Sequence, residues 1–196
     1  MVAIIDYDTG NLRSVMNALE RASVEYVVTS DHDVLRSADR VLLPGVGEAS
    51  SAMEKLRERG LDRLIPTLRQ PVLGICIGMQ LMCESSEEGS AECLGIFSTK
   101  VRRLSEAEAA HLKVPHVGWD TIEGLRSPLF EGVGESSHFY YVHSFAADVC
   151  DQTIATTDYG VVFSAALHRD NFYGTQFHPE KSGSVGEVVL ANFLKI

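Results

Sequence analysis

The first eighty residues alternate between short apolar runs and segments with helical spacing, and this alternation limits the fold more than any other feature of the chain. Apolar runs occupy residues 2–6, 25–29, 40–43 and 71–75, and helical spacing marks residues 12–22, 33–37, 52–56 and 61–68. Strands that alternate with helices predict a parallel sheet covered on both faces. Ligands of such sheets bind beyond the carboxyl ends of the strands, which are here the turns after residues 6, 43 and 75.

The second half of the chain has a different pattern. After a polar loop at residues 85–90, strand-like stretches follow closely at residues 95–97, 100–104, 116–122, 139–145, 153–157, 162–168 and 172–177. Short links favour antiparallel pairing, and a helix is predicted at residues 185–194. We therefore predict an α/β fold with a doubly wound, mostly parallel central sheet flanked by helices and with additional antiparallel strands. No linker or repeat interrupts the chain, so a single domain is expected over residues 1–196.

Charge and cysteine spacing exclude several classes of function. A formal net charge of −10 argues against binding to a nucleic-acid backbone. No apolar run approaches the roughly 20 residues that cross a bilayer, and residues 1–6 lack the features of a signal peptide. The cysteines Cys76, Cys83, Cys93 and Cys150 fit no zinc spacing, so we expect neither a metal nor another cofactor. Nothing suggests secretion, and we predict a reducing, cytoplasmic location.

Cys76 lies between two glycines at the turn after the fourth predicted strand. Gly74-Ile75-Cys76-Ile77-Gly78 is the cysteine version of the nucleophile elbow G-x-S-x-G. A Cβ at either glycine would collide with neighbouring backbone where a strand reverses into a helix. The start of a helix also favours the reactive thiolate. The alternative is a buried core cysteine, because cysteine is among the most buried residue types.

His178 and Glu180 are two residues apart and follow the last predicted strand. In an extended segment such residues point the same way, so the carboxylate can orient the imidazole as in a catalytic triad. The alternative is a strand-end histidine with a local hydrogen bond. A thiolate that attacks an amide also needs an oxyanion hole. The N–H of Ile77 and the glycine-rich turn at residues 44–47 are candidates, although the latter also fits a plain strand-to-helix turn.

Three motifs together resemble the class I, or triad-type, glutamine amidotransferases. They are GICIGMQ at residues 74–80, PGVG at residues 44–47 and HPE at residues 178–180. Stretches at residues 6–12, 115–119, 140–145 and 176–182 further resemble the glutaminase subunits of imidazole glycerol phosphate synthase. The resemblance runs nearly end to end. It implies a glutaminase of histidine biosynthesis that hydrolyses glutamine and passes ammonia to a separate cyclase subunit, which forms imidazole glycerol phosphate and an aminoimidazole carboxamide ribotide.

The resemblance also implies a role for individual residues. Cys76 attacks the glutamine side chain, His178 relays protons, and Glu180 orients His178. The oxyanion hole is formed by Val46, whose strand rearranges in relatives, and by Ile77. Glutamine is held at Gly47, Gln80, Glu88, Ser144 and Phe145, and the cyclase contacts Asn11, Trp119, Tyr140 and Lys181 in a heterodimer.

Several alternatives stay open at the level of sequence. Glu88 is otherwise a solvated loop charge, and Trp119 is otherwise a core residue. Asp8 departs from the family, which more often has glycine there, and this bears on the geometry of the interface. As a whole, the chain could serve another synthase, act alone as a cysteine hydrolase, or be a catalytically silent scaffold.

Overall fold

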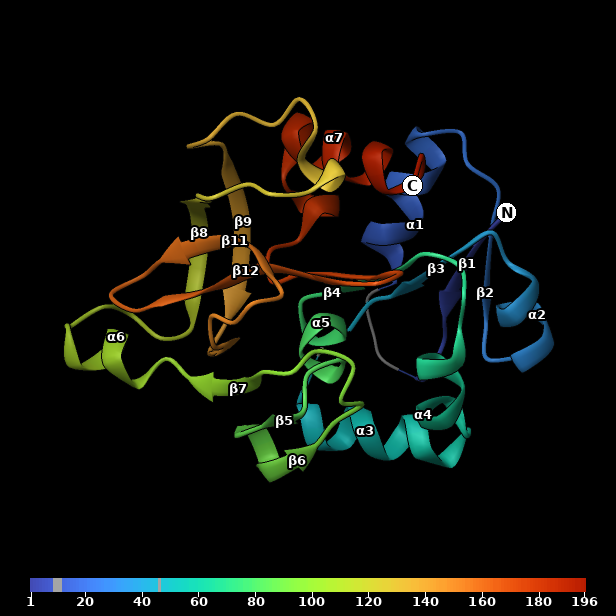
Figure 1. Ribbon diagram of the computed structural model, residues 1–196, viewed down its shortest axis with the longest axis horizontal. Helices are drawn as coiled ribbons and strands as arrows, with labels where there is room; N and C mark the ends of the chain where they lie inside the picture. The colour runs from blue at the N-terminus through green and yellow to red at the C-terminus, as the bar shows by residue number, and fades with distance from the viewer. Residues whose placement is uncertain (9–11, 46) are drawn as a thin grey trace.

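The chain folds around a seven-stranded sheet in the order β11-β12-β13-β4-β3-β1-β2 (Figure 1). The computed structural model describes residues 1–8, 12–45 and 47–196. Five neighbouring strands are parallel: β1 (Val2–Ile5), β2 (Tyr26–Thr29), β3 (Arg40–Leu43), β4 (Val72–Ile75) and β13 (Phe172–Thr175). Two antiparallel strands complete one edge: β11 (Thr153–Asp158) and β12 (Val162–Arg169). The predicted α/β fold with a mostly parallel sheet is therefore confirmed.

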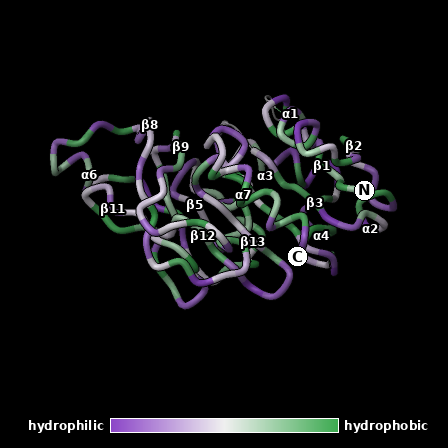
Figure 2. The backbone as a smooth tube through the Cα atoms, turned by 90° about the horizontal axis from the view of Figure 1, so that it is seen from above, coloured by the Kyte–Doolittle hydropathy of each residue, from purple (hydrophilic) through white to green (hydrophobic). Residues whose placement is uncertain are grey.

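Helices cover both faces of this sheet, as the alternation of strands and helices predicts. In Figure 1, α1 (Arg13–Arg21) and α7 (Gly183–Phe193) lie above it, and α3 (Ala49–Glu58), α4 (Leu61–Leu64) and α5 (Ile77–Leu81) lie below. The short helix α2 (His32–Ser37) stands beside the edge strand β2. All four residues of β1, β4 and β13 are buried, and Figure 2 shows apolar stretches gathered along the strands. The core therefore lies on both sides of the parallel strands.

Two smaller sheets are built from the second half of the chain. One has the order β10-β7-β5-β6 and the other is the hairpin β8-β9. Their strands are β5 (Ser85–Ser86), β6 (Ala91–Glu92), β7 (Lys100–Arg103), β8 (His116–Thr121), β9 (His138–His143) and β10 (Phe145–Ala147). Both views place α6 (Ser105–Ala109) and the hairpin at the end of the molecule opposite α2. Single helical turns of the 3-10 type are η1 (Ile65–Thr67), η2 (Glu88–Ser90), η3 (Pro128–Phe130) and η4 (Pro179–Lys181).

The predicted strand at residues 95–97 is wrong. The N–H groups of Leu94, Gly95 and Phe97 donate to the carbonyls of Leu81, Cys83 and Met82. This segment therefore satisfies the carbonyls that the end of α5 leaves without partners, and it does not pair in a sheet.

Three other segments also differ from the predicted elements. The polar loop at residues 85–90 contains β5 and η2, and α6 is an element that the sequence pattern does not predict. The strand predicted at residues 139–145 is interrupted at Ser144, because β9 pairs with β8 whereas β10 pairs with β7. The chain thus changes from one sheet to another at Ser144.

Among the described residues, no helix combines the length and the apolar character that crossing a bilayer requires.

Candidate active site

Cys76 occupies a strained elbow at the carboxyl end of β4. Its φ of +53° is rare for a residue with a side chain, and α5 begins at the next residue. The flanking glycines allow this turn: a Cβ at Gly78 would lie 1.7 Å from the carbonyl oxygen of Leu43, and one at Gly74 would lie 2.7 Å from the backbone of Gly78. The predicted collisions are confirmed. Cys76 is 5% exposed and borders a cavity, so its burial does not make it a closed core position.

His178 follows the adjacent strand β13 and is held by Glu180. Its Nδ1 lies 2.8 Å from Oε1 of Glu180, and both side chains are 4% exposed. The predicted contact is present, but its predicted cause is wrong, because residues 179–181 form the 3-10 turn η4 and are not extended. The turn folds the carboxylate back onto the ring. The backbone is fixed as well: His178 N–H donates to the carbonyl of Tyr140 at 2.9 Å, and Ser182 Oγ donates to the carbonyl of His178 at 2.6 Å.

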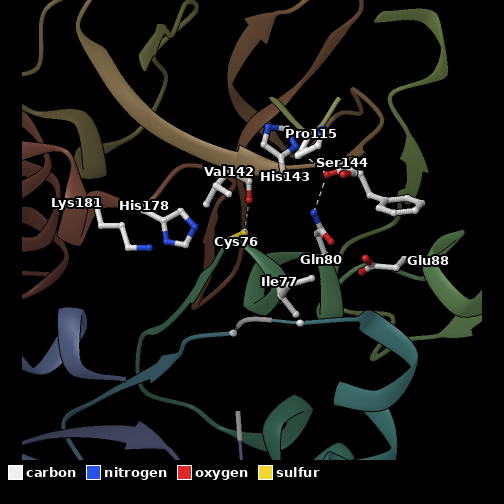
Figure 3. A pocket seen from close by; sticks show the side chains of 13 residues that line it. Cys76, Ile77, Gln80, Glu88, Pro115, Val142, His143, Ser144, His178 and Lys181 are labelled. Carbon is white, nitrogen blue, oxygen red and sulfur yellow. Dashed lines mark hydrogen bonds between the residues drawn. The ribbon is translucent and has the colours of Figure 1, made fainter. Parts of the chain in front are cut away.

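The other ring nitrogen of His178 is buried and has no hydrogen-bond partner among the described residues. The ring lies beside the sulfur of Cys76 (Figure 3). Burial opposes the charge on His178, but Cys76 and Glu180 outweigh it and raise the pKa of His178 to about 10. The protonated imidazole is therefore the electrostatically favoured form of His178 at this site.

The oxyanion-hole candidates lie at the ends of two neighbouring strands. Ile77 is the first residue of α5, where a backbone N–H has no acceptor within the helix. Across from it, a Cβ at Gly45 would lie 2.9 Å from the Cβ of Ile77 and 2.7 Å from Tyr7 Oη, so the turn after β3 packs against the elbow. Gly47 has a φ of +98°. Val46, the second predicted donor, lies outside the described residues.

Cys76, His178 and the predicted substrate residues surround one cavity of about 310 Å³ (Figure 3). It is lined by Gly45, Gly47, Cys76, Ile77, Gln80, Glu88, Pro115, Val142, His143, Ser144, Phe145, His178 and Lys181. Glu180 stands behind His178 and does not line it. The neighbouring parallel strands β3, β4 and β13 contribute residues that follow their carboxyl ends, and β9 of the separate hairpin contributes Val142 and His143. The expected meeting of the turns after residues 43 and 75 is confirmed, whereas no described residue of the turn after residue 6 is among those that line the cavity.

The side chains of Gln80 and Glu88 point into this cavity and are held by different hydrogen bonds. Gln80 is 1% exposed, and its amide nitrogen donates to the carbonyl of Phe145 at 2.8 Å, whereas its Oε1 is buried without a partner. Glu88 Oε2 accepts the N–H of Ala49 at 3.0 Å, at the start of α3. Burial raises the pKa of Glu88 above its usual value, with a smaller opposing effect of the Ala49 N–H. Glu88 is therefore half-buried and structurally tied, and not a free loop charge.

Three of the predicted interface residues form a surface beside the cavity. Trp119 is 54% exposed, which excludes the core alternative, and its ring meets that of Tyr140 edge to face at 6.0 Å. The Lys181 ammonium lies 6.0 Å from the centre of the Tyr140 ring. The fourth predicted residue, Asn11, lies outside the described residues. The departure at Asp8 has a conformational explanation: its φ is +59°, a region that glycine adopts most easily and aspartate tolerates.

Three buried side chains that support the site are not identified by the sequence. Gln176 is fully buried and contacts both Gln80 and Cys76. His143 Nδ1 lies 2.9 Å from the carbonyl of Phe145, and His143 Nε2 lies 3.3 Å from Nδ1 of His116. Gln176 belongs to a recognised motif, but its contacts depend on residues nearly a hundred positions away. His116 and His143 lie in the stretches at residues 115–119 and 140–145 that resemble the family, but no local spacing indicates that their rings meet.

The described part of the chain contains no cluster of three or more histidine, cysteine, aspartate or glutamate side chains that could hold a metal ion. All four cysteines are free.

Comparison with known proteins gives consistent matches over the whole chain. Residues 3–196 match the family described as Glutamine amidotransferase class-I. The chain is 57% identical to the imidazole glycerol phosphate synthase subunit HisH of Bacteroides thetaiotaomicron, over 100% of this chain and 99% of that protein. It is 45% identical to the protein of the same name from Haemophilus influenzae, over 99% and 96% of the two chains.

Solved structures share the fold at much lower sequence identity. The crystal structure of one glutamine amidotransferase superposes with a TM-score of 0.75 at 17% identity, covering 100% of this chain and 98% of that one. A glutamine amidotransferase from Thermotoga maritima gives a TM-score of 0.72 at 14% identity, covering 99% and 96%. These two similarities concern the fold alone.

Proposed function

This chain belongs to the class-I glutamine amidotransferases, and on that premise we propose that it is the glutaminase subunit of an imidazole glycerol phosphate synthase, with Cys76, His178 and Glu180 as its catalytic triad. The observation that carries the triad is the buried, unpartnered nitrogen of His178 beside the sulfur of Cys76, with the opposite ring nitrogen held by Glu180. This is the relation of nucleophile, base and orienting group that acyl transfer requires.

The first half of the reaction forms a thioester. The Cys76 thiolate attacks the side-chain carbonyl carbon of glutamine, and the carbonyl oxygen becomes an oxyanion that the N–H of Ile77 stabilises. The N–H of Val46 is the second donor in this proposal. The imidazolium of His178 then gives its proton to the amide nitrogen, the C–N bond breaks, and ammonia leaves.

The second half of the reaction returns the enzyme to its starting state. His178, now neutral, takes a proton from water, and the resulting hydroxide attacks the thioester carbon. The C–S bond breaks, glutamate leaves, and the Cys76 thiolate is restored beside the protonated His178. One water is consumed for each glutamine, and Glu180 keeps the imidazole in one orientation throughout.

Substrate contacts follow from the lining of the cavity. The unpartnered Oε1 of Gln80 and the half-buried carboxylate of Glu88 are acceptors suited to the ammonium group of glutamine. Backbone groups of Gly47, Ser144 and Phe145 complete the glutamine site in this proposal. The acceptor of the ammonia is a separate cyclase subunit in a heterodimer, which we expect to contact Asn11, Trp119, Tyr140 and Lys181. We expect the complex in the cytoplasm.

Replacement of the nucleophile tests the triad. Cys76→Ala should lower glutamine hydrolysis by at least about 10⁴-fold in the complex with the cyclase, because the covalent intermediate can no longer form. Cys93→Ala is the matched control, since Cys93 is half-buried, its thiol lies 3.8 Å from the carbonyl of Ala91, and it does not line the cavity. Undiminished ammonia release from the Cys76→Ala complex would contradict the proposal.

Assays with and without the cyclase discriminate among the remaining functions. Strong stimulation of glutamine hydrolysis by the cyclase and its ligand is expected for a synthase subunit. Equal activity without the partner would favour a cysteine hydrolase that acts alone, and no activity in either state would favour a silent scaffold. Failure to form a complex with the cyclase would favour the glutaminase subunit of another synthase.

A further inference from the structure

Gln176 lies fully buried between β13 and His178, and the triad described above does not use it. Both ends of its side-chain amide are engaged. Its Oε1 lies 2.9 Å from the amide nitrogen of Gln80, and its Nε2 lies 3.6 Å from the sulfur of Cys76. The side chain therefore connects a residue of the substrate cavity directly to the nucleophile.

The orientation of both amides follows from one backbone carbonyl. The oxygen of Phe145 can only accept a hydrogen bond, so the group of Gln80 that lies 2.8 Å from it must be the nitrogen (Figure 3). The same nitrogen faces Gln176, which must therefore present its oxygen to Gln80. The Nε2 of Gln176 therefore faces Cys76, so the group beside the sulfur is a hydrogen-bond donor.

A donor at this distance acts differently on the two forms of the sulfur. The protonated thiol can donate to the carbonyl of Val142, which lies 3.9 Å away. The thiolate can only accept, and a hydrogen bond to a charged acceptor is stronger than one to a neutral acceptor. The Gln176 amide therefore favours the thiolate over the thiol and holds its position at the elbow.

We propose that Gln176 is a further catalytic residue, whose side-chain N–H donates to the Cys76 thiolate and both stabilises and aims it. The proposal rests on the function above only in taking Cys76 as the nucleophile. Among the cavity-lining side chains, the titratable groups that face the same space are His178 after β13, Lys181 in η4, His143 in β9 and Glu88 in η2. The Nε2 of Gln176 lies within hydrogen-bond distance of the sulfur, at 3.6 Å, and is separate from the ring of His178.

The pH dependence of Cys76 alkylation by iodoacetamide tests this contact in the full chain. The Cys76 peptide is quantified by mass spectrometry, which separates it from the other cysteine peptides. Gln176→Met removes the donor, and we expect the half-maximal rate to move up by about one pH unit. Gln176→Glu keeps an acceptor for Gln80 but places a carboxylate beside the sulfur, so we expect a shift of about two units.

Gln152→Glu is the matched control. Gln152 uses its Oε1 to accept the N–H of Ser98, an interaction that a carboxylate preserves, and it does not line the cavity. It should leave the alkylation profile unchanged. In the cyclase complex, Gln176→Met should lower kcat for glutamine by about 10-fold or more with a smaller change in KM, since the contact acts on the nucleophile.

Two results would overturn the proposal. One is an unchanged alkylation profile in both Gln176 variants. The other is loss of cooperative thermal unfolding in both, which would make Gln176 a structural residue. Both results are measured without glutamine turnover. They are therefore distinct from the test of the proposed function, which full activity of Cys76→Ala would contradict.

Discussion

At Cys76, the conformation of a single residue determines where the thiol can go. A φ of +53° costs a residue with a side chain on the order of 1–3 kcal/mol. The surrounding contacts hold this conformation: the Cys76 N–H donates to the carbonyl of Thr175 at 2.7 Å, and its carbonyl accepts from Gln80 N–H at 3.1 Å. Gly78 lets α5 approach the end of β3. The position of the Cys76 side chain is thus fixed by backbone packing.

A methyl group at Gly78 should break this packing. Its Cβ would lie 1.7 Å from the carbonyl oxygen of Leu43, and a backbone atom cannot move aside as a flexible side chain can. We expect Gly78→Ala to lower the free energy of unfolding by about 3 kcal/mol or more, measured by urea denaturation. Gly134→Ala is the control, because its Cβ would meet only Ser137 Oγ at 3.8 Å. Equal midpoints for the two variants would refute this account of the elbow.

The residues that sequence could identify are those whose role depends on neighbours in the chain. The glycines around Cys76 and the pair His178 and Glu180 are of this kind, and their contacts are present. The role of Gln176 could not be predicted from spacing. The carbonyl of Phe145 orients the amide of Gln80, and the amide of Gln80 in turn orients that of Gln176. Local spacing carries no information about such a chain of contacts.

At the scale of elements, the hairpin of β8 and β9 joins a buried network to an exposed surface. On its inner face, His116 stacks on Tyr159 with ring centres 3.8 Å apart and meets His143. His143 must carry its proton on Nδ1, because that atom faces the carbonyl of Phe145. Its Nε2 then accepts from Nδ1–H of His116. The backbone beside the cavity is thereby tied to the hairpin.

This network should make the fold sensitive to acid. Burial lowers the pKa of His143 to about 3, with the Phe145 carbonyl opposing and the charges of His116 and His178 adding to the effect. Below pH 6.5 the unfolded chain therefore binds a proton that folded His143 does not. Stability falls as the pH falls, by up to about 1.4 kcal/mol per pH unit from this group. Between pH 6.5 and pH 5 the loss is about 2 kcal/mol.

Urea denaturation at several pH values measures this contribution. His143→Gln removes the titrating group, so the free energy of unfolding should depend less steeply on pH between 6.5 and 5. His138→Gln is the matched control, since His138 is an exposed histidine on the same strand. If the His143 variant and the wild type showed the same slope, His143 would not be the source of the acid sensitivity.

Elements were predictable where one pattern dominates. The buried parallel strands and their helices were identified by near-continuous apolar runs. The segment at residues 95–97 also has an apolar run, but it satisfies the end of α5. The break at Ser144 marks a change of partner strand, which leaves no gap in the apolar pattern. Periodicity indicates burial and not the identity of the hydrogen-bond partner.

At the scale of the whole molecule, the cavity and the exposed hairpin face belong to one end of the structure. Val117 and Trp119 alternate on β8, and their cross-strand partners Val142 and Tyr140 lie on the same face. Val117, Trp119 and Val142 are 56%, 54% and 37% exposed. The carbonyl of Val142 points to Cys76, so the apolar surface borders the proposed nucleophile. A cyclase bound there would cover the cavity from which ammonia leaves.

Loss of Trp119 should therefore weaken assembly. Tryptophan at the centre of an interface commonly contributes about 2 kcal/mol or more, which corresponds to about 30-fold in Kd. We expect Trp119→Ala to raise the Kd for the cyclase by at least about this factor in isothermal titration calorimetry. Val162→Ala provides the comparison, because Val162 is 52% exposed at the start of β12 and does not line the cavity, so its loss should leave the Kd unchanged. If both variants bound the cyclase like the wild type, the cyclase would have to bind a different surface. Ammonia would then have to leave the cavity on a side other than that of the β8-β9 hairpin.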